Sequence, residues 1–146
     1  MYLIINKLTG GKFREATRPS WKGFSYKTKA AATAGITRTK KYYQNAIDDV
    51  ARVVADGQPE YTSNMYNAFR DATEDRGAAT WSRRSYDYRE VCNGNALEVV
   101  AEADYTEPMV TTTGTSPYNG ATITRTIALS RVGTHMDPLC ESHYTR

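Results

Sequence analysis

Residues 26–43 read YKTKAAATAGITRTKKYY, and this stretch decides how the fold is organised. Small and apolar side chains recur at helical spacing from Ala31 to Tyr43, which predicts an amphipathic helix from about residue 25 or 28 to residue 43. Because the buried side is made of small residues until its last turn, this helix can pack very closely against a sheet. Gly35 costs roughly 1 kcal/mol in a helix relative to Ala, so we expect a close backbone contact there.

The residues before this helix predict a β-hairpin. Residues 2–7 are β-branched and apolar, and a second short strand-like run covers residues 12–16. Thr9-Gly10-Gly11 lies between them, and glycine is the residue that a tight hairpin turn favours.

The residues after it predict more helices and then strands. Apolar periodicity indicates a second helix over about 44–56, a third from a cap at Thr62 or Ser63 to about Asp75, and a fourth over about 79–92. Residues 96–101, 109–113 and 121–131 read as strands, and the last fifteen residues look irregular. The expected fold is one α+β domain over residues 1–146, with a small antiparallel sheet from N- and C-terminal strands packed against three or four central helices.

Charge is distributed very unevenly along the chain. The first 43 residues carry ten Lys and Arg against one acid, Glu15, whereas the remaining 103 carry nine against fifteen acids. The overall charge of +3 therefore combines a part at +9 with a part at −6. A basic segment of this kind can bind nucleic acid, an acidic protein surface or the acidic part of a second copy.

Composition favours a folded, non-membrane protein. The chain has 40% hydrophobic and 24% charged residues, which is typical of a folded domain rather than a disordered one. It contains no apolar run long enough to span a membrane and no signal-peptide pattern, so we expect a cytoplasmic protein without a disulfide between Cys92 and Cys140. The eleven tyrosines are typical either of a small core whose boundary consists of amphipathic rings or of a surface that binds a partner.

One cluster has the residue types of a metal site. His135, Asp137, Cys140 and His143 fall within nine residues, and imidazole, thiolate and carboxylate are natural zinc ligands. Their spacing differs from the usual zinc motifs, and an irregular tail offers little support to orient ligands. A surface tail with a turn at Asp137-Pro138 is favoured over a metal site or a Cys–His nucleophile. We expect no metal, no cofactor and no catalytic residue.

Basic and aromatic residues make the candidate binding set. Residues 81–89 read WSRRSYDYR and interleave arginines with rings, as do the lysines and rings of the N-terminal third. Such mixtures can stack on bases and neutralise phosphates, although an ordinary solvated surface has the same composition. The predicted partner-binding residues are Trp21, Lys22, Lys27, Lys29, Arg38, Lys40, Lys41, Arg83, Tyr86 and Arg89.

Two segments resemble a known group of proteins. Residues 26–38, YKTKAAATAGITR, resemble the segment Y-K-T-x-x-A-A-x-A-G-L-T-R of small uncharacterised proteins from tailed bacteriophages. In those proteins a strand like 97–102 follows, and the C-terminal tail is comparable with residues 136–144 but lacks these histidines. The resemblance implies a phage origin and a helical insertion over residues 41–95 into a smaller β-α-β core. It carries over no activity.

These observations lead to two functional expectations. The first is a non-enzymatic bacteriophage protein, most simply a structural or assembly protein associated with the capsid or tail, which contacts other virion proteins or copies of itself. The alternative is a phage accessory protein that binds nucleic acid or an acidic host protein during infection. The expected location is the virion or the host cytoplasm, with no membrane partner.

Overall fold

The computed structural model of the chain describes residues 1–57, 63–74, 88–116 and 118–139. These residues form two compact units, one up to Tyr105 and one from Thr106 onward. Helices and antiparallel strands are both present and are segregated along the chain, which confirms the α+β class. The expectations of a single domain and of an insertion over 41–95 stay predictions. No helix in the described ranges is long and apolar enough to cross a membrane.

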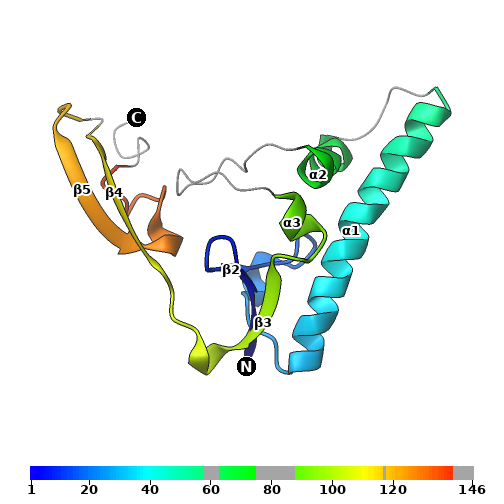
Figure 1. Ribbon diagram of the computed structural model, residues 1–146, viewed down its shortest axis with the longest axis horizontal. Helices are drawn as coiled ribbons and strands as arrows, with labels where there is room; N and C mark the ends of the chain where they lie inside the picture. Colours follow the sequence, from blue (N-terminus) through cyan, green and yellow to red (C-terminus); the bar gives the residue numbers. More distant parts are fainter. Residues whose placement is uncertain (58–62, 75–87, 117, 140–146) are drawn as a thin grey trace. The chain divides into compact units, whose positions relative to one another are not determined.

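The sheet of the first unit is built around strand β1 (Tyr2–Asn6), which pairs antiparallel with β2 (Gly11–Phe13) on one side and with β3 (Leu97–Ala101) on the other. Figure 1 shows these three strands beside the long helix. Burial of four consecutive β1 residues shows that both faces of this central strand are covered. Gly10 has a φ of 78°, a left-handed value that glycine adopts readily, and this completes the predicted hairpin.

Helix α1 (Lys29–Ala55) is a single helix of 27 residues, so the prediction of two separate helices meeting at residues 43 and 44 is wrong. No Pro or Gly interrupts the chain there, and the buried stripe continues from Tyr43 through Ala46 to Val50. The side chain of Thr28 caps the first turn by accepting a hydrogen bond from the Ala31 N–H.

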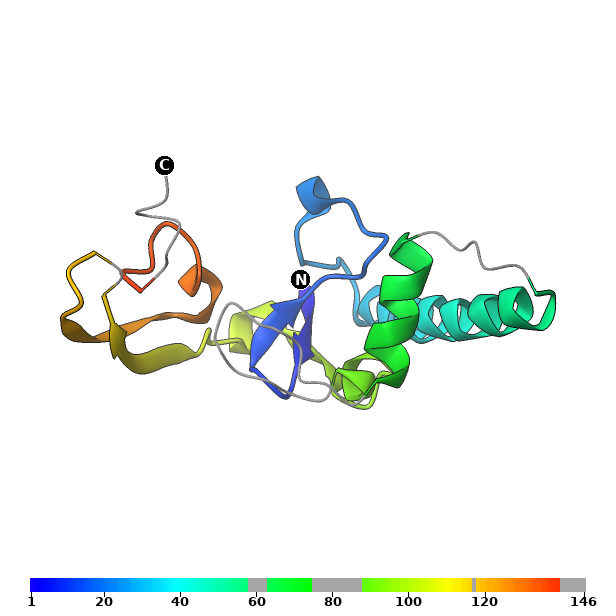
Figure 2. The same ribbon diagram turned by 90° about the horizontal axis from the view of Figure 1, so that it is seen from above.

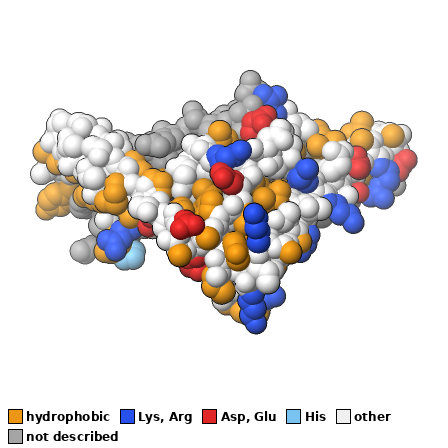
Figure 3. All heavy atoms as spheres, turned by 60° about the horizontal axis from the view of Figure 1, so that its bottom comes forward, with side chains coloured by type: hydrophobic (Ala, Val, Ile, Leu, Met, Phe, Trp, Pro, Cys, Tyr) orange, Lys and Arg blue, Asp and Glu red, His pale blue; other side chains and the backbone are white. Residues whose placement is uncertain are grey.

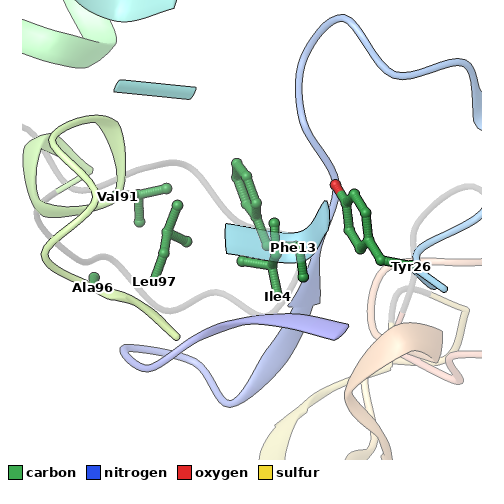
Figure 4. Packing of buried hydrophobic residues seen from close by; sticks show 7 residues of the cluster. Ile4, Phe13, Tyr26, Val91, Ala96 and Leu97 are labelled. Atoms are coloured by element: carbon green, nitrogen blue, oxygen red, sulfur yellow. The ribbon is translucent and has the colours of Figure 1, made fainter. Parts of the chain in front are cut away.

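The main core lies between α1 and the sheet. Its buried members come from the strands, the segment between β2 and α1, the first turn of α1 and the segment before β3: Ile4, Phe13, Tyr26, Ala32, Val91, Ala96 and Leu97. In Figure 4, Ile4 and Phe13 lie between Tyr26 on one side and Val91, Ala96 and Leu97 on the other. A Cβ atom on Gly35 would lie 2.9 Å from a Glu15 carboxylate oxygen and from the Tyr26 hydroxyl. The close contact expected at Gly35 is therefore confirmed.

Two shorter helices pack near the middle of α1. Helix α2 (Ser63–Thr73) matches the predicted third helix, and Figure 2 shows it crossing α1. Helix α3 (Arg89–Cys92) is the described end of the predicted fourth helix, whose residues 79–87 lie outside the described ranges. Tyr43 and Ala46 of α1 form a second buried cluster with Ala68 and Cys92.

The second unit is a β-hairpin with a folded tail. Strands β4 (Met109–Thr115) and β5 (Thr122–Ala128) pair antiparallel in a two-stranded sheet of their own. Strands from both ends of the chain were expected to share one sheet, and among the described strands this holds for β3 but not for β4 and β5. A short 3-10 turn (Leu129–Arg131) follows, and the tail then buries Val132, Asp137 and Leu139. The expectation of an exposed surface tail is therefore wrong over these residues.

Candidate partner-binding surfaces

A buried carboxylate fixes the segment between β2 and α1. Glu15, the single acid of the basic N-terminal part, is 5% exposed. Arg38 of α1 donates to it from two nitrogens, with Nε–Oε1 at 2.7 Å and Nη2–Oε2 at 3.1 Å. The Tyr26 hydroxyl donates to the same carboxylate. This network links Glu15 and Tyr26, two residues of the segment, to Arg38 of α1.

The protonation states of this network follow from its contacts. Burial by itself raises the pKa of Glu15, but the hydrogen bonds from Arg38 and Tyr26 outweigh burial and leave that pKa below its ordinary value. Burial and the bond to Glu15 raise the pKa of Tyr26 to about 12. At neutral pH Glu15 is thus an anion and Tyr26 a neutral donor. Arg38, a predicted partner-binding residue, is 55% exposed but already has Glu15 as its counter-charge.

Arg18 holds the segment between residues 18 and 26 in one shape. Its guanidinium donates to three backbone carbonyl oxygens, those of Gly23 at 3.1 Å, Lys22 at 3.3 Å and Ser25 at 2.7 Å. The same guanidinium lies 4.2 Å from the centre of the Tyr26 ring, within the range of a cation–π contact. Gly23 allows the turn because its φ of 65° lies in the left-handed region. We call residues 18–26 the Trp21 loop.

The Trp21 loop displays an indole ring to solvent. Trp21 lies in a short 3-10 turn (Ser20–Lys22) and is 80% exposed, the highest value among the large hydrophobic side chains described. The Lys22 ammonium lies 5.4 Å from the centre of its ring. Figure 2 shows the loop projecting away from β1 and α1. Lys27 and Lys29, which follow the loop, are also exposed. Four predicted partner-binding residues, Trp21, Lys22, Lys27 and Lys29, therefore lie in the loop or between it and the first residue of α1.

A pocket of about 700 Å³ gathers three other predicted residues, Lys40, Lys41 and Arg89. Its lining comes from the middle of α1, the end of α2 and the α3 turn: Thr37, Lys40, Lys41, Tyr43, Gln44, Ile47, Ala72, Arg89, Glu90, Cys92 and Asn93. Among the described lining residues, Lys40, Lys41 and Arg89 are cations and Glu90 is an acid. Burial raises the pKa of Tyr43, so its phenol stays protonated at neutral pH.

The basic side chains do not form one continuous stripe on the face that Figure 3 shows. Near the centre and at the right of that view, Lys and Arg stand in small groups with hydrophobic and acidic side chains between them. Lys29 and Lys40 lie on one side of α1 but about 16 Å apart, from the rise of 1.5 Å per helical residue. Apart from Arg38, the predicted residues that the structure describes therefore fall into two separate groups within the first unit, one at the Trp21 loop and one at the pocket.

The remaining candidates fall elsewhere. Arg83, Tyr86, Cys140 and His143 lie outside the described residues. Asp137 is 2% exposed, and two of its partners are nitrogens of Arg125, at 2.8 and 3.2 Å. Because its oxygens accept these bonds and those of two backbone amides, Asp137 acts as the counter-ion of a buried arginine. Within the described ranges no three potential metal ligands gather at one point.

Sequence reasoning missed both ion pairs that involve a buried carboxylate, although each had a signal. Glu15 is a lone acid among ten basic residues, and a single opposite charge in such a run has a strong electrostatic reason to be paired. Arg125 falls on the inward side of an alternating strand, where an arginine needs a carboxylate partner. The role of Arg18 had no such signal, because its targets are backbone carbonyls whose positions depend on the folded loop.

No protein-family model, curated protein or solved structure matches this chain. The resemblance of residues 26–38 to tailed-phage proteins therefore stays a prediction. Within the described residues, the predicted binding residues other than Arg38 lie on or next to a loop held by hydrogen bonds of Arg18, or around a pocket lined by three cations.

Proposed function

We propose that this chain is a non-enzymatic bacteriophage protein, an accessory structural or assembly protein of the virion that binds another protein through the Trp21 loop. One observation carries the proposal: Trp21 is 80% exposed on a loop whose backbone is held by Arg18. Such an indole is partly desolvated by any protein that covers it, and tryptophan is enriched among the residues that dominate binding energy.

The hydrogen bonds from Arg18 that hold the loop support a binding role. A loop that is already ordered loses little conformational entropy when it binds, so more of the contact energy appears as affinity. Lys22, Lys27 and Lys29 are exposed and lie close to Trp21 in the sequence. Their charge favours an acidic partner surface and speeds its association. Within a particle, that partner would be another virion protein or the acidic part of another copy.

The state of the buried polar groups supports the non-enzymatic part of the proposal. General acid–base catalysis needs a group whose pKa lies near the working pH and that reaches substrate. Glu15 has a lowered pKa and is closed in by Arg38, while Tyr26 has a pKa of about 12. Cys92 lines the pocket but is only 3% exposed, so its thiol offers little surface to a substrate.

The test is incorporation into particles. Quantitative mass spectrometry of purified virions should find the protein at a fixed copy number, and Trp21→Ala should lower that number at least tenfold. Trp21→Phe keeps an aromatic anchor and should retain most of it. Val54→Ala is the matched control, because Val54 is an exposed apolar residue of α1 in the same unit. Absence of the wild-type protein from particles, or equal loss with Val54→Ala, would contradict the proposal.

A second candidate function is binding of single-stranded nucleic acid, and a specific cluster favours it. The Lys12 ammonium lies 5.9 Å from the Phe24 ring and 5.7 Å from the Tyr105 ring, and Arg14 lies 5.6 Å from Phe24. Cations beside aromatic rings are what base stacking with phosphate neutralisation uses. On this alternative the protein acts in the host cytoplasm.

Salt and charge reversal separate the two candidates. Binding of a labelled single strand should weaken steeply with salt and should be abolished by changing Lys12 and Arg14 to Glu while the fold is retained. Binding that survives this double change would contradict the nucleic-acid candidate. The particle assay with Trp21→Ala would still test the first candidate, the virion protein.

A further inference from the structure

The hairpin of the second unit has one face without any charge. Seen across the two strands, this face consists of four facing pairs, and six of its eight side chains are threonines: Met109–Ala128, Thr111–Thr126, Thr113–Thr124 and Thr115–Thr122. All six threonines are exposed. In a chain with 24% charged residues, an exposed two-stranded face with no charged side chain is unusual enough to need an explanation.

The threonines of facing strands already bond to one another. The hydroxyls of Thr111 and Thr126 are 2.8 Å apart, and those of Thr113 and Thr124 are 2.7 Å apart. These distances are typical of O–H···O hydrogen bonds. Threonine opposite threonine is therefore a pairing that this chain demonstrably uses between antiparallel strands.

The backbone of β4 directs part of its hydrogen-bonding groups away from β5, toward its outer edge. The Ser116 N–H donates to the Ala121 carbonyl at 2.7 Å, and the Leu129 N–H donates to the Pro108 carbonyl at 2.9 Å. Bonded and non-bonded pairs alternate along an antiparallel ladder, so Thr111, Thr113 and Thr115 point their amides and carbonyls away from β5. In the described part of the chain no third strand pairs with this sheet.

The sequence of β4 lacks the residue types that normally protect an edge strand. The seven residues of β4, MVTTTGT, include no Lys, no other charge and no Pro. Natural proteins use such residues to prevent edge-to-edge pairing, and a two-stranded sheet by itself is marginally stable in water. In the pair Met109–Ala128, β4 contributes Met109, which is 59% exposed, and β5 contributes the smaller Ala128. The edge of β4 therefore offers the larger apolar contact.

We propose that the β4 edges of two copies of this chain pair antiparallel about a twofold axis and form one continuous four-stranded sheet. An edge that pairs with itself must be complementary to itself, and the neutral threonine edge satisfies this condition. The axis passes beside Thr112, so that Thr111 of each copy faces Thr113 of the other in a hydrogen-bonded pair. This contact belongs to the second unit and is independent of the Trp21 loop, so it adds self-association to the proposed function.

Light scattering on a sizing column tests the proposal with the full chain. The wild-type protein should have twice the monomer mass in about 0.1 M and in about 1 M salt, because screening over about 3 Å leaves backbone hydrogen bonds between neutral strands intact. Thr113→Pro should give a monomer, because it removes an amide that points out of the hairpin. A wild-type monomer, or a dimer that dissociates as salt rises, would overturn the proposal.

The matched control is Thr124→Pro, which makes the same change on the facing residue of β5 and removes the same hydroxyl pair. It should remain a dimer. If Thr113→Pro and Thr124→Pro both give monomers, or if Thr113→Pro stays dimeric, the β4 contact is wrong.

A cross-link gives the register directly. At the twofold axis the two copies of residue 112 form a non-hydrogen-bonded pair, with Cα atoms about 4.5 Å apart, which suits a disulfide. In a Cys140→Ser background, Thr112→Cys should therefore form a covalent dimer under mild oxidation, whereas Thr124→Cys should not. A Thr112→Cys protein that stays uncross-linked while dimeric would overturn this register.

Discussion

Gly35 shows how much can depend on one missing side chain. Its position in α1 lets the Glu15 carboxylate and the Tyr26 hydroxyl approach the helix backbone, and a Cβ atom there would lie 2.9 Å from both and 3.0 Å from Ile4. Contacts that short require the neighbours to move. Those neighbours are held in a buried network, so they cannot yield without weakening it.

Gly35→Ala should therefore lower the free energy of unfolding by about 1–3 kcal/mol, even though Ala is intrinsically the better helix former by about 1 kcal/mol. Chemical denaturation followed by far-UV circular dichroism measures this. In a Tyr26→Phe background, which removes one of the crowded oxygens, the loss should be smaller. A stabilising Gly35→Ala would show that the approach of Glu15 and Tyr26 is not needed.

The ion pair between Arg125 and Asp137 should behave differently when one or both partners are removed. Both side chains are buried, so Asp137→Ala leaves an uncompensated charge and should destabilise the second unit by about 3–5 kcal/mol. The joint change Arg125→Met with Asp137→Leu should be much milder, since it removes both charges. Hydrogen exchange over residues 106–139 measures the stability of the second unit. If the single and the joint changes lower this stability equally, the unpaired charge is not the cause of the destabilisation.

At the scale of elements, the Trp21 loop depends on one guanidinium. Arg18→Lys keeps the positive charge but loses the forked geometry that reaches the carbonyls of Gly23, Lys22 and Ser25. Fluorescence anisotropy decay of Trp21, in a Trp81→Phe background, should show a larger rapid amplitude than in the unmodified loop. The circular dichroism spectrum should be unchanged, and Lys27→Arg serves as a control. An unchanged decay would mean that other contacts hold the loop.

Elements were predictable from the sequence where local chemistry specified them. The Gly10 turn, the capped start of α1 and the third helix needed only turn, cap and periodicity rules. The continuity of α1 was missed because the sequence offers two apolar stripes, and only tertiary packing shows that one helix carries both. The separate β4–β5 sheet was missed because strand patterns identify strands but not their partners.

The candidate sites were predictable to a similar extent. The sequence singled out Trp21 and the lysines as partner-binding candidates, and the structure shows these side chains exposed. The sequence could not separate the loop from the pocket, because Lys40 and Arg89 meet only through the packing of α3 on α1. It also could not show that Arg38 is paired, because Glu15 comes from a distant part of the sequence.

At the scale of the whole molecule, the described residues of each unit include one buried carboxylate with a lowered pKa. Burial would raise the pKa of Glu15 and Asp137, but their hydrogen bonds to arginines outweigh it. A carboxyl whose pKa is lower in the folded than in the unfolded protein stabilises the fold when it is ionised. This contribution is complete above the pKa of the unfolded state and declines as the pH falls toward the pKa of the folded state. The unfolded values are 4.5 for Glu15 and 3.8 for Asp137, so both contributions are present at neutral pH and are lost in acid.

Acid should therefore destabilise both units, and neutral substitutions should flatten the response of one unit at a time. Between about pH 5 and pH 2, hydrogen exchange should show Glu15→Gln reducing the pH dependence of the first unit, and Asp137→Asn that of the second. Each variant leaves the other unit as a built-in control. A flattened response in both units with either variant would show that the two do not titrate separately.

The central position of β1 has a consequence for biosynthesis. Its neighbour β3 pairs with it residue by residue from Tyr2–Ala101 to Asn6–Leu97, so nearly all of the first unit must be translated before the sheet can close. Contacts between segments so distant in the chain form slowly. At about 5–20 residues per second, Leu3, Ile4 and Ile5 wait for seconds as a nascent hydrophobic strand with only β2 beside it. A chaperone that shields this strand on the ribosome would raise the yield of folded protein, and slowing translation just before β3 would lower it.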